Sequence, residues 1–67
     1  MSLGKKLGEN LRKLRLEKKM SQGDLATALS VDRAYISNIE NGRMNPTIAT
    51  LEKIAGALNI TSSELLK

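Results

Sequence analysis

Apolar residues recur at intervals of three and four along most of this chain, which is the spacing of an α-helix with one buried side. No stretch alternates apolar and polar residues for long enough to predict a β-strand. The pattern predicts an all-α fold with five helical segments, at residues 3–19, 21–29, 33–41, 48–58 and 61–66. The positions expected to face inward are Leu3, Leu7, Leu11, Leu14, Leu25, Ala26, Leu29, Ile36, Ile39, Ile48, Leu51, Ile54, Ala55 and Leu58. Leu16 falls off this pattern and is expected to be exposed.

Short polar residues and a glycine mark the expected ends of these helices. The side chains placed to accept hydrogen bonds from the first turn of a helix are those of Ser21, Asp32, Thr47 and Thr61. Ser21 and Thr61 each precede an acidic residue by three positions, which predicts the reciprocal hydrogen bonds of a capping box. Gly42 suits the left-handed residue that ends a helix, and Asn59 is the expected end of the fourth helix.

The second and third segments have the arrangement of a helix-turn-helix, in which two short helices pack against each other across a tight turn. Ser30 and Val31 form the predicted turn. At about 100° per residue, Ile36 and Ile39 lie on one side of the third helix. The opposite side carries Arg33, Ala34, Ser37, Asn38 and Asn41. Because the second helix of this motif packs by one side, these five side chains are expected to project outward.

These outward side chains match the groups that base pairs present in the major groove of DNA. Arg33 can form two hydrogen bonds with guanine, and Asn38 can form two with adenine. Ala34 permits close approach of the helix, and Ser37 can donate or accept a hydrogen bond. Any one of these residues taken alone is most simply explained as a solvated surface residue. Their grouping on one face of a helix-turn-helix favours a base-reading surface.

Residues that flank this face are candidates for contacts with the DNA backbone. Gln22 opens the second helix, where its side chain and the helix N-terminus can both meet a phosphate. Asn41 and Arg43 lie at the far end of the third helix and can hold the backbone from the other side. Tyr35 borders the inward and outward sides. Its ring can therefore pack at the edge of the core, or its hydroxyl can reach a phosphate.

The charge of the chain is uneven, which agrees with a polyanionic partner. The formal net charge is +4, and residues 1–33 contain eight Lys or Arg against four Asp or Glu. Residues 34–67 contain three of each kind. A solvated surface explains the charge alone equally well. The length of 67 residues predicts one small domain, and the helix-turn-helix with its outward face makes residues 1–67 a single candidate DNA-binding domain.

The residue types that are absent limit the chemistry. The sequence has no Cys and no His, and therefore lacks thiolate and imidazole metal ligands and the commonest general base. Tyr35 is the single residue among Phe, Trp and Tyr, which argues against an aromatic platform for stacking bases. We expect no enzymatic activity, cofactor, metal site or small-molecule substrate. No apolar run is long enough for a membrane span or a signal peptide, which predicts a cytoplasmic protein without membrane contact.

Three stretches of the sequence together resemble the Cro/C1-type helix-turn-helix family, also called the xenobiotic-response-element family. They are LRKLRLEKKMSQGDLA, YISNIENG and NPTIATLEKIAGALNI, and the resemblance extends over about residues 7 to 66. It implies a compact, five-helix, lambda-repressor-like DNA-binding domain whose third helix reads the major groove. The base contacts that it implies are those of Arg33, Ala34, Ser37 and Asn38. The phosphate contacts that it implies are those of Gln22, Tyr35, Asn41 and Arg43. It also implies a structural ion pair between Arg15 and Glu40.

Two residues depart from the family pattern. Ser30 stands in the turn where the family often has Gly, and a residue other than Gly adopts the left-handed conformation at some energetic cost. Gly56 stands inside the fourth predicted helix, where a larger helix former is common. We expect Gly56 to be tolerated there rather than to admit a neighbouring backbone.

The resemblance implies a sequence-specific transcriptional regulator, such as a repressor, that binds an inverted-repeat operator in double-stranded DNA as a homodimer. The expected dimer surface consists of Asn59, Ile60, Thr61, Leu65 and Leu66. Within the family, VDRAYISNIE is also similar to the recognition helix of restriction–modification controller proteins. A second interpretation stays open, in which the chain is an antitoxin or adaptor module whose main partner is another protein. The chain can be a complete regulator or one domain of a longer one.

Overall fold

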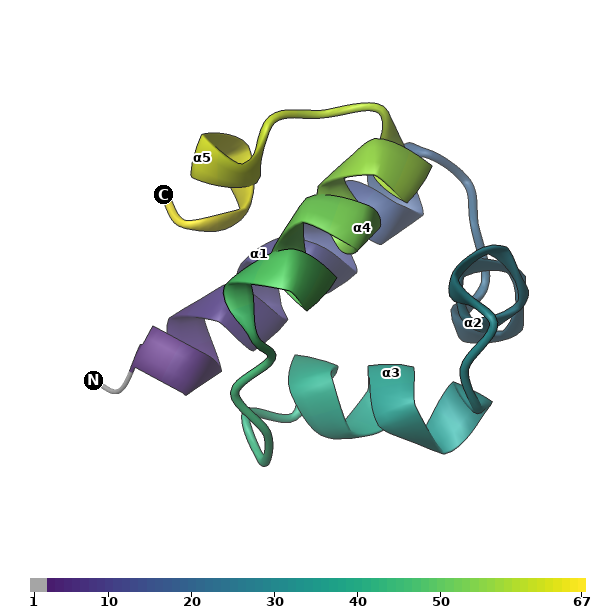
Figure 1. The fold of residues 1–67 in the computed structure, drawn as a ribbon, viewed down its shortest axis with the longest axis horizontal. Coiled ribbons are helices and arrows are strands. Elements are labelled where there is room, and N and C mark those ends of the chain that lie inside the picture. The colour runs from purple at the N-terminus through teal and green to yellow at the C-terminus, as the bar shows by residue number, and fades with distance from the viewer. Residues whose placement is uncertain (1–2) are drawn as a thin grey trace.

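The computed structural model describes residues 3–67, which form five α-helices around one shared core (Figure 1). The helices are α1 (Leu3–Glu17), α2 (Gln22–Leu29), α3 (Arg33–Glu40), α4 (Ile48–Leu58) and α5 (Ser62–Leu65). The described residues contain no β-strand. The predicted all-α fold is therefore confirmed, and the predicted helix boundaries differ from those of the structure by at most two residues.

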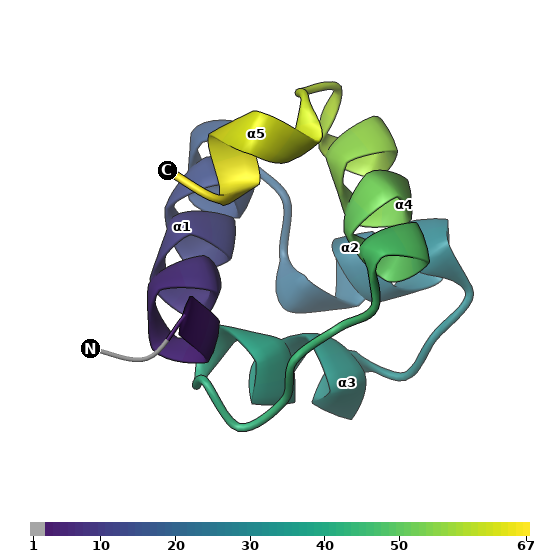
Figure 2. The same cartoon turned by 60° about the vertical axis from the view of Figure 1, so that its left-hand side comes forward.

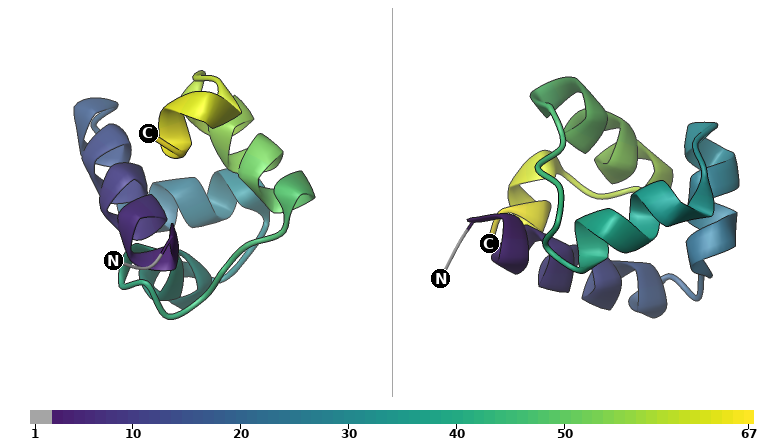
Figure 3. Two further views of the ribbon diagram at one scale, coloured as in Figure 1. Left: turned by 90° about the vertical axis from the view of Figure 1, so that its left-hand side faces the viewer. Right: turned by 90° about the horizontal axis from the view of Figure 1, so that it is seen from below.

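The five helices enclose the core as a ring rather than as a bundle of parallel rods. Figure 2 shows α1 and α4 on opposite sides, with α3 across one end and α5 across the other. The left view of Figure 3 shows the same ring, with α2 behind it. Since α2 packs against both α3 and α4, it closes the side of the ring away from the C-terminal end. This arrangement leaves one long side of α3 without a covering helix.

The core is formed by apolar side chains from all five helices. They are Leu7, Leu11, Leu25, Ala26, Ile36, Ile39, Ile54, Ala55, Leu58 and Leu65. The spacing of apolar residues predicts all of these except Leu65, and the half-buried Leu14, Leu29 and Leu51 pack against them. Leu16 is 55% exposed, as predicted. The prediction for Leu3 falls on a side chain outside the described residues.

The prediction that Ile48 faces the core is wrong, because its side chain is 75% exposed. Ile48 is the first residue of α4 and lies in angular register with the buried Ala55. Side chains in a helix lean toward its N-terminus, however, so the side chain of a first residue points past the end of the packed surface. Helical spacing gives the direction of a residue around the helix axis but not its position along the core.

A glycine in α1 permits close approach of two helix backbones. A Cβ atom built on Gly8 would lie 2.4 Å from the carbonyl oxygen of Ile39 and 2.6 Å from that of Glu40, at the end of α3. The spacing of residues in α1 does not predict this contact. Gly56 in α4 is the opposite case, since a Cβ atom there would have nothing within 4 Å. The expectation that Gly56 is merely tolerated is confirmed.

The predicted capping box at the start of α2 is present. The Ser21 hydroxyl oxygen accepts a hydrogen bond from the Asp24 backbone N–H at 2.9 Å, and Asp24 Oδ2 accepts one from the Ser21 N–H at 2.9 Å. The backbone N–H of Ser21, and with it the Ser21 side chain, lowers the pKa of the Asp24 carboxyl, because both stabilise its charged form. The contribution of Asp24 to stability is therefore present above its ordinary pKa and is lost as the pH falls through the lowered value.

The other three helix caps match the predictions made from the sequence only in part. Thr47 accepts a hydrogen bond from the Thr50 N–H at 3.2 Å, as predicted. Asp32 and Thr61 occupy the N-cap positions, but neither side chain makes a cap hydrogen bond. The capping box predicted at Thr61 is therefore wrong. The Thr61 hydroxyl lies 3.0 Å from that of Ser63 and pairs with it instead.

Candidate nucleic-acid interface

A tight turn between α2 and α3 sets the two helices across each other. Ser30 adopts the left-handed conformation, with φ of 58° and ψ of 42°. The Val31 N–H then donates to the Ala26 carbonyl oxygen at 3.0 Å, which completes the end of α2. The predicted turn, with a residue other than Gly in the left-handed conformation, is confirmed. Since both helices direct their buried residues at the core, the far side of α3 faces outward.

The five side chains predicted to project from α3 lie together on this outward side. Arg33, Ala34 and Asn41 are exposed, and Ser37 and Asn38 are half-buried. Figure 1 shows α3 along the lower edge of the molecule, and the right view of Figure 3 shows it uncovered from below. Asn41 Nδ2 donates a hydrogen bond to Ser37 Oγ at 3.3 Å. The face thus combines donors and acceptors with one small apolar residue.

The N-terminus of α2 lies beside this face. Gln22 is the first residue of α2, and it lines a shallow hollow together with Arg33, Ala34 and Ser37 of α3. The backbone N–H groups of Gln22 and Gly23 have no hydrogen-bond partner within residues 3–67. Such free N–H groups at a helix N-terminus favour a bound anion.

The two remaining candidates for phosphate contact differ in their surroundings. Arg43 is exposed in the loop after α3, and its N–H donates to the Asn38 carbonyl oxygen at 2.9 Å. Tyr35 is half-buried, and its ring packs against the core. The alternative in which Tyr35 packs at the edge of the core therefore describes its ring, while its hydroxyl stays a candidate for a phosphate.

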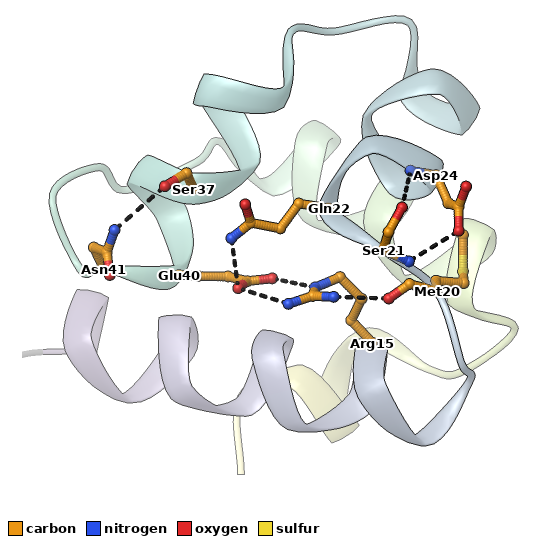
Figure 4. A network of polar contacts seen from close by, with 8 residues as sticks. All are labelled: Arg15, Met20, Ser21, Gln22, Asp24, Ser37, Glu40 and Asn41. Atoms are coloured by element: carbon orange, nitrogen blue, oxygen red, sulfur yellow. Dashed lines mark hydrogen bonds and ion pairs between the residues drawn. The ribbon is translucent and has the colours of Figure 1, made fainter.

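A buried polar network connects α1, α2 and α3 behind this face (Figure 4). Arg15 Nε lies 2.6 Å from Glu40 Oε2, and Arg15 Nη2 lies 3.2 Å from Glu40 Oε1. Arg15 Nη1 donates to the Met20 carbonyl oxygen at 2.7 Å. Gln22 Nε2 donates to Glu40 Oε1 at 3.1 Å. The pair of Arg15 and Glu40 is the one implied by the family resemblance, whereas the hydrogen bonds to Met20 and from Gln22 are not predicted from the sequence.

The burial of this ion pair raises the free-energy cost of breaking it. The side chains of Arg15 and Glu40 are only 9% and 4% exposed. An exposed pair contributes at most about 1 kcal/mol, whereas removing one partner of a buried pair costs about 3–5 kcal/mol, because the other charge is left unpaired. The two-pronged geometry of a guanidinium and a carboxylate also fixes the relative position of α1 and α3.

The predicted dimer surface at the C-terminal end needs one correction. Leu65 is fully buried, at 0% exposure, and Asn10 Nδ2 donates to its carbonyl oxygen at 2.9 Å. Its side chain is therefore not available to a dimer interface, because α5 packs it into the core of the same chain, against α1 and α4. Asn59, Thr61 and Leu66 are exposed and Ile60 is half-buried, so these four residues stay available.

An apolar groove lies next to Leu66. It has a volume of about 460 Å³ and lies between the start of α1, the loop before α4, and the C-terminal end of the chain. Its lining includes Leu7, Pro46, Leu51 and Leu66. Ile48 lies between two of these residues in the sequence and is the most exposed large apolar side chain of the described chain.

Comparison with known proteins identifies the family to which this chain belongs. A family model described as helix-turn-helix matches residues 11–65, so the chain belongs to the helix-turn-helix family. The chain is 48% identical over 61 residues to the control protein C.MunI of a Mycoplasma species, covering 90% of this chain and 82% of that protein. It is 38% identical over 60 residues to the immunity repressor protein of Bacillus phage phi105, but it spans only 42% of that protein's length.

A solved structure supports the same assignment. The crystal structure of the restriction–modification controller protein C.AhdI from Aeromonas hydrophila matches with a TM-score of 0.88 and 39% identity, over 92% of this chain and 94% of that one. The family resemblance stated from the sequence is therefore confirmed. The family is one of DNA-binding transcriptional regulators and not of enzymes. None of the helices within residues 3–67 has the length and apolar character needed to cross a membrane.

Proposed function

We propose that this protein is a sequence-specific transcriptional regulator that binds an inverted-repeat site in double-stranded DNA as a homodimer, with α3 in the major groove. The observation that carries the proposal is the outward side of α3 beside the free N-terminus of α2. A helix held by one side and uncovered on the other fits the width of the major groove.

In this proposal the base contacts come from four residues of α3. Arg33 and Asn38 supply the paired hydrogen bonds that distinguish guanine and adenine from other bases. Ala34 lies between them in the sequence and allows the helix to come close. Ser37 accepts a hydrogen bond from Asn41, which leaves its hydroxyl hydrogen free to donate to an acceptor on a base.

The phosphate contacts come from both ends of the same face. Gln22 and the free N–H groups at the start of α2 hold one phosphate. Asn41 and Arg43 hold the backbone at the far end of α3, and the Tyr35 hydroxyl, which comes from the first turn of α3, contacts a separate phosphate. These contacts set the position of α3 in the groove, and the four base contacts then read the sequence.

A homodimer is proposed because one recognition helix reads too few base pairs to define a site. Two copies related by a two-fold axis read half-sites about 34 Å apart along the DNA. We place the interface at Asn59, Ile60, Thr61 and Leu66. The apolar groove beside Leu66 extends this surface, and burying it would remove apolar area from water.

Replacing Leu66 with Lys is expected to weaken dimerisation at least tenfold without lowering the thermal stability of the monomer. Leu66 is 43% exposed and lies at the edge of the groove, so the charge would be buried only in the dimer. Size-exclusion chromatography with light scattering at tens of micromolar measures the change. Leu16→Lys is the matched control, because Leu16 is 55% exposed on α1 and is expected to have no effect. Monomer alone for the unaltered protein would contradict the proposed dimer.

The resemblance to controller proteins supports one subclass. The chain covers most of the length of both C.MunI and C.AhdI, whereas it covers less than half of the phage repressor. We therefore propose that it acts like those small regulators, as a controller of restriction–modification genes. No observation on this molecule favours the alternative of an antitoxin or adaptor for another protein, and the experiment below separates the two.

Selection of bound duplexes from a random pool at near-physiological salt, followed by sequencing, tests the proposal. The expected result is an enriched inverted repeat whose half-site spacing reports the geometry of the dimer. Weak, salt-sensitive binding without enrichment would contradict a sequence-specific regulator and would favour the protein-binding alternative.

A further inference from the structure

We infer that Glu40 is a positioning residue for DNA binding, and that its buried carboxylate holds the Gln22 side chain in the orientation that serves a phosphate. The inference rests on the proposed function, in which Gln22 contacts the DNA backbone. It assigns to Glu40 a part beyond the ion pair with Arg15, although Glu40 itself is buried away from the DNA-facing surface.

The geometry places one carboxylate oxygen between two donors. Glu40 Oε1 accepts from Arg15 Nη2 at 3.2 Å and from Gln22 Nε2 at 3.1 Å, and Oε2 accepts from Arg15 Nε at 2.6 Å (Figure 4). The Glu40 side chain is only 4% exposed. Water therefore competes little for the Gln22 contact, and a hydrogen bond to a charged acceptor is stronger than one to a neutral acceptor.

The charge of Glu40 determines which end of the Gln22 amide points inward. An amide has a donating NH₂ group and an accepting oxygen, and the two ends can exchange by a half-turn. A carboxylate only accepts, so the NH₂ group must face Glu40. A phosphate also only accepts hydrogen bonds. The second N–H of the same NH₂ group is therefore the one available to it, and Glu40 keeps that group at the required place.

Gln22 lies at a position where a fixed orientation of its side-chain amide would assist DNA binding. It lines one hollow with Arg15, Ser21, Gly23 and Arg33, and a second with Arg33, Ala34 and Ser37. It therefore lies between the free N–H groups of α2 and the base-reading side of α3. A side chain already fixed there loses less conformational freedom on binding than a mobile one.

The substitution Glu40→Gln separates this inference from simple electrostatics. It keeps the shape of the side chain but raises the net charge of +4 by one, which by itself strengthens binding to DNA. The inference predicts the opposite, a dissociation constant about three- to tenfold higher, which is the range for one lost hydrogen bond. The loss should be equal on the selected duplex and on an unrelated duplex, because a phosphate contact carries no sequence information.

A double-mutant cycle tests whether Glu40 acts through Gln22. Gln22→Ala alone should weaken binding to a similar extent, and Glu40→Gln should cause no further loss in the Gln22→Ala background. Arg15→Lys is the matched control. It disturbs the same ion pair and lowers stability but leaves the carboxylate for Gln22, so affinity should change less than about twofold. Additive losses in the double variant, or tighter binding by Glu40→Gln, would overturn the inference.

A measurement on the free protein keeps the inference testable if Glu40→Gln fails to fold or if no DNA site is found. NMR relaxation of the Gln22 side-chain amide in the unaltered protein should show an order parameter close to that of the backbone. A mobile amide would overturn the inference whatever the protein binds. An ordered amide in a protein that binds no DNA would support the positioning by Glu40 and contradict the proposed function instead.

Discussion

Replacing Gly8 with Ala is expected to leave most of the protein unfolded at room temperature. The added Cβ atom would lie 2.4 Å from the Ile39 carbonyl oxygen and 2.6 Å from the Glu40 carbonyl oxygen. Both neighbours are backbone atoms, so no side-chain rotation relieves the overlap. The end of α3 must instead move away from α1. Urea and thermal unfolding followed by circular dichroism measure the change.

The size of this effect follows from two costs that act together. Overfilling a packed core costs about 1–3 kcal/mol even where side chains can adjust. Moving the end of α3 also separates Glu40 from Arg15, and breaking a buried ion pair costs about 3–5 kcal/mol. A single core in a domain of this size rarely supplies more than about 3–5 kcal/mol of stability. The combined cost is therefore comparable with the whole stability of the domain.

Gly56→Ala is the matched control, because it adds the same methyl group to another helix. A Cβ atom at Gly56 would have no heavy atom within 4 Å. Gly56 is exposed to solvent and lies within α4 rather than at its end. Alanine there is expected to raise the free energy of unfolding by about 0.5–1 kcal/mol, since glycine is the poorer helix former. Gly8→Ala is expected to lower the unfolding midpoint and Gly56→Ala to raise it. If both variants shifted the midpoint in the same direction, the effect of Gly8→Ala could not be attributed to the close contact between α1 and α3.

Local features of the fold were readable from the sequence because neighbouring residues determine them. The Ser21 cap and the Thr47 cap depend on residues within one helical turn of each other. The periodic apolar residues gave nearly all of the core for the same reason. Thr61 shows the limit of this approach, because Ser63 offers its hydroxyl a competing partner that the spacing rule does not consider.

Features that depend on contacts between distant segments could not be read in this way. The closeness of Gly8 to the end of α3 joins residues about thirty positions apart, and the spacing of Gly8 in α1 is compatible with an ordinary helix surface. Leu65 is buried because α5 folds back against Asn10 of α1, whereas its sequence context shows only a leucine near the chain end. Ile48 has the correct helical phase but lies beyond the packed surface.

The same distinction between local features and contacts of distant segments applies to the candidate site. Helical phase alone placed Arg33, Ser37 and Asn38 on one side of α3, and the structure leaves that side uncovered. The hydrogen bond between Gln22 and Glu40 joins two helices, and neither residue type nor spacing predicts it. Contact with DNA itself stays a prediction for every one of these residues, and it is tested by substitution.

Replacing both Arg33 and Asn38 with Ala is expected to abolish preference for the selected DNA site while leaving the fold intact. Each paired hydrogen bond to a base contributes about 1–3 kcal/mol of discrimination. A homodimer presents both residues twice, so the double variant loses four such contacts. Affinity for the selected duplex should fall at least a hundredfold, to the level of an unrelated duplex. Binding of labelled duplexes measured by fluorescence anisotropy gives both values.

Arg43→Ala is the matched comparison, because it also removes a charged side chain from the same surface. Arg43 lies in the loop after α3 and is proposed to contact a phosphate, so its loss should weaken binding to both duplexes by the same factor. It should also reduce the dependence of affinity on salt by about one phosphate contact per subunit. If Arg33→Ala and Asn38→Ala behaved like Arg43→Ala, α3 would lie against the DNA backbone rather than in the groove. If Arg33→Ala and Asn38→Ala left the affinity for both duplexes unchanged, the outward side of α3 would not be the DNA-binding surface.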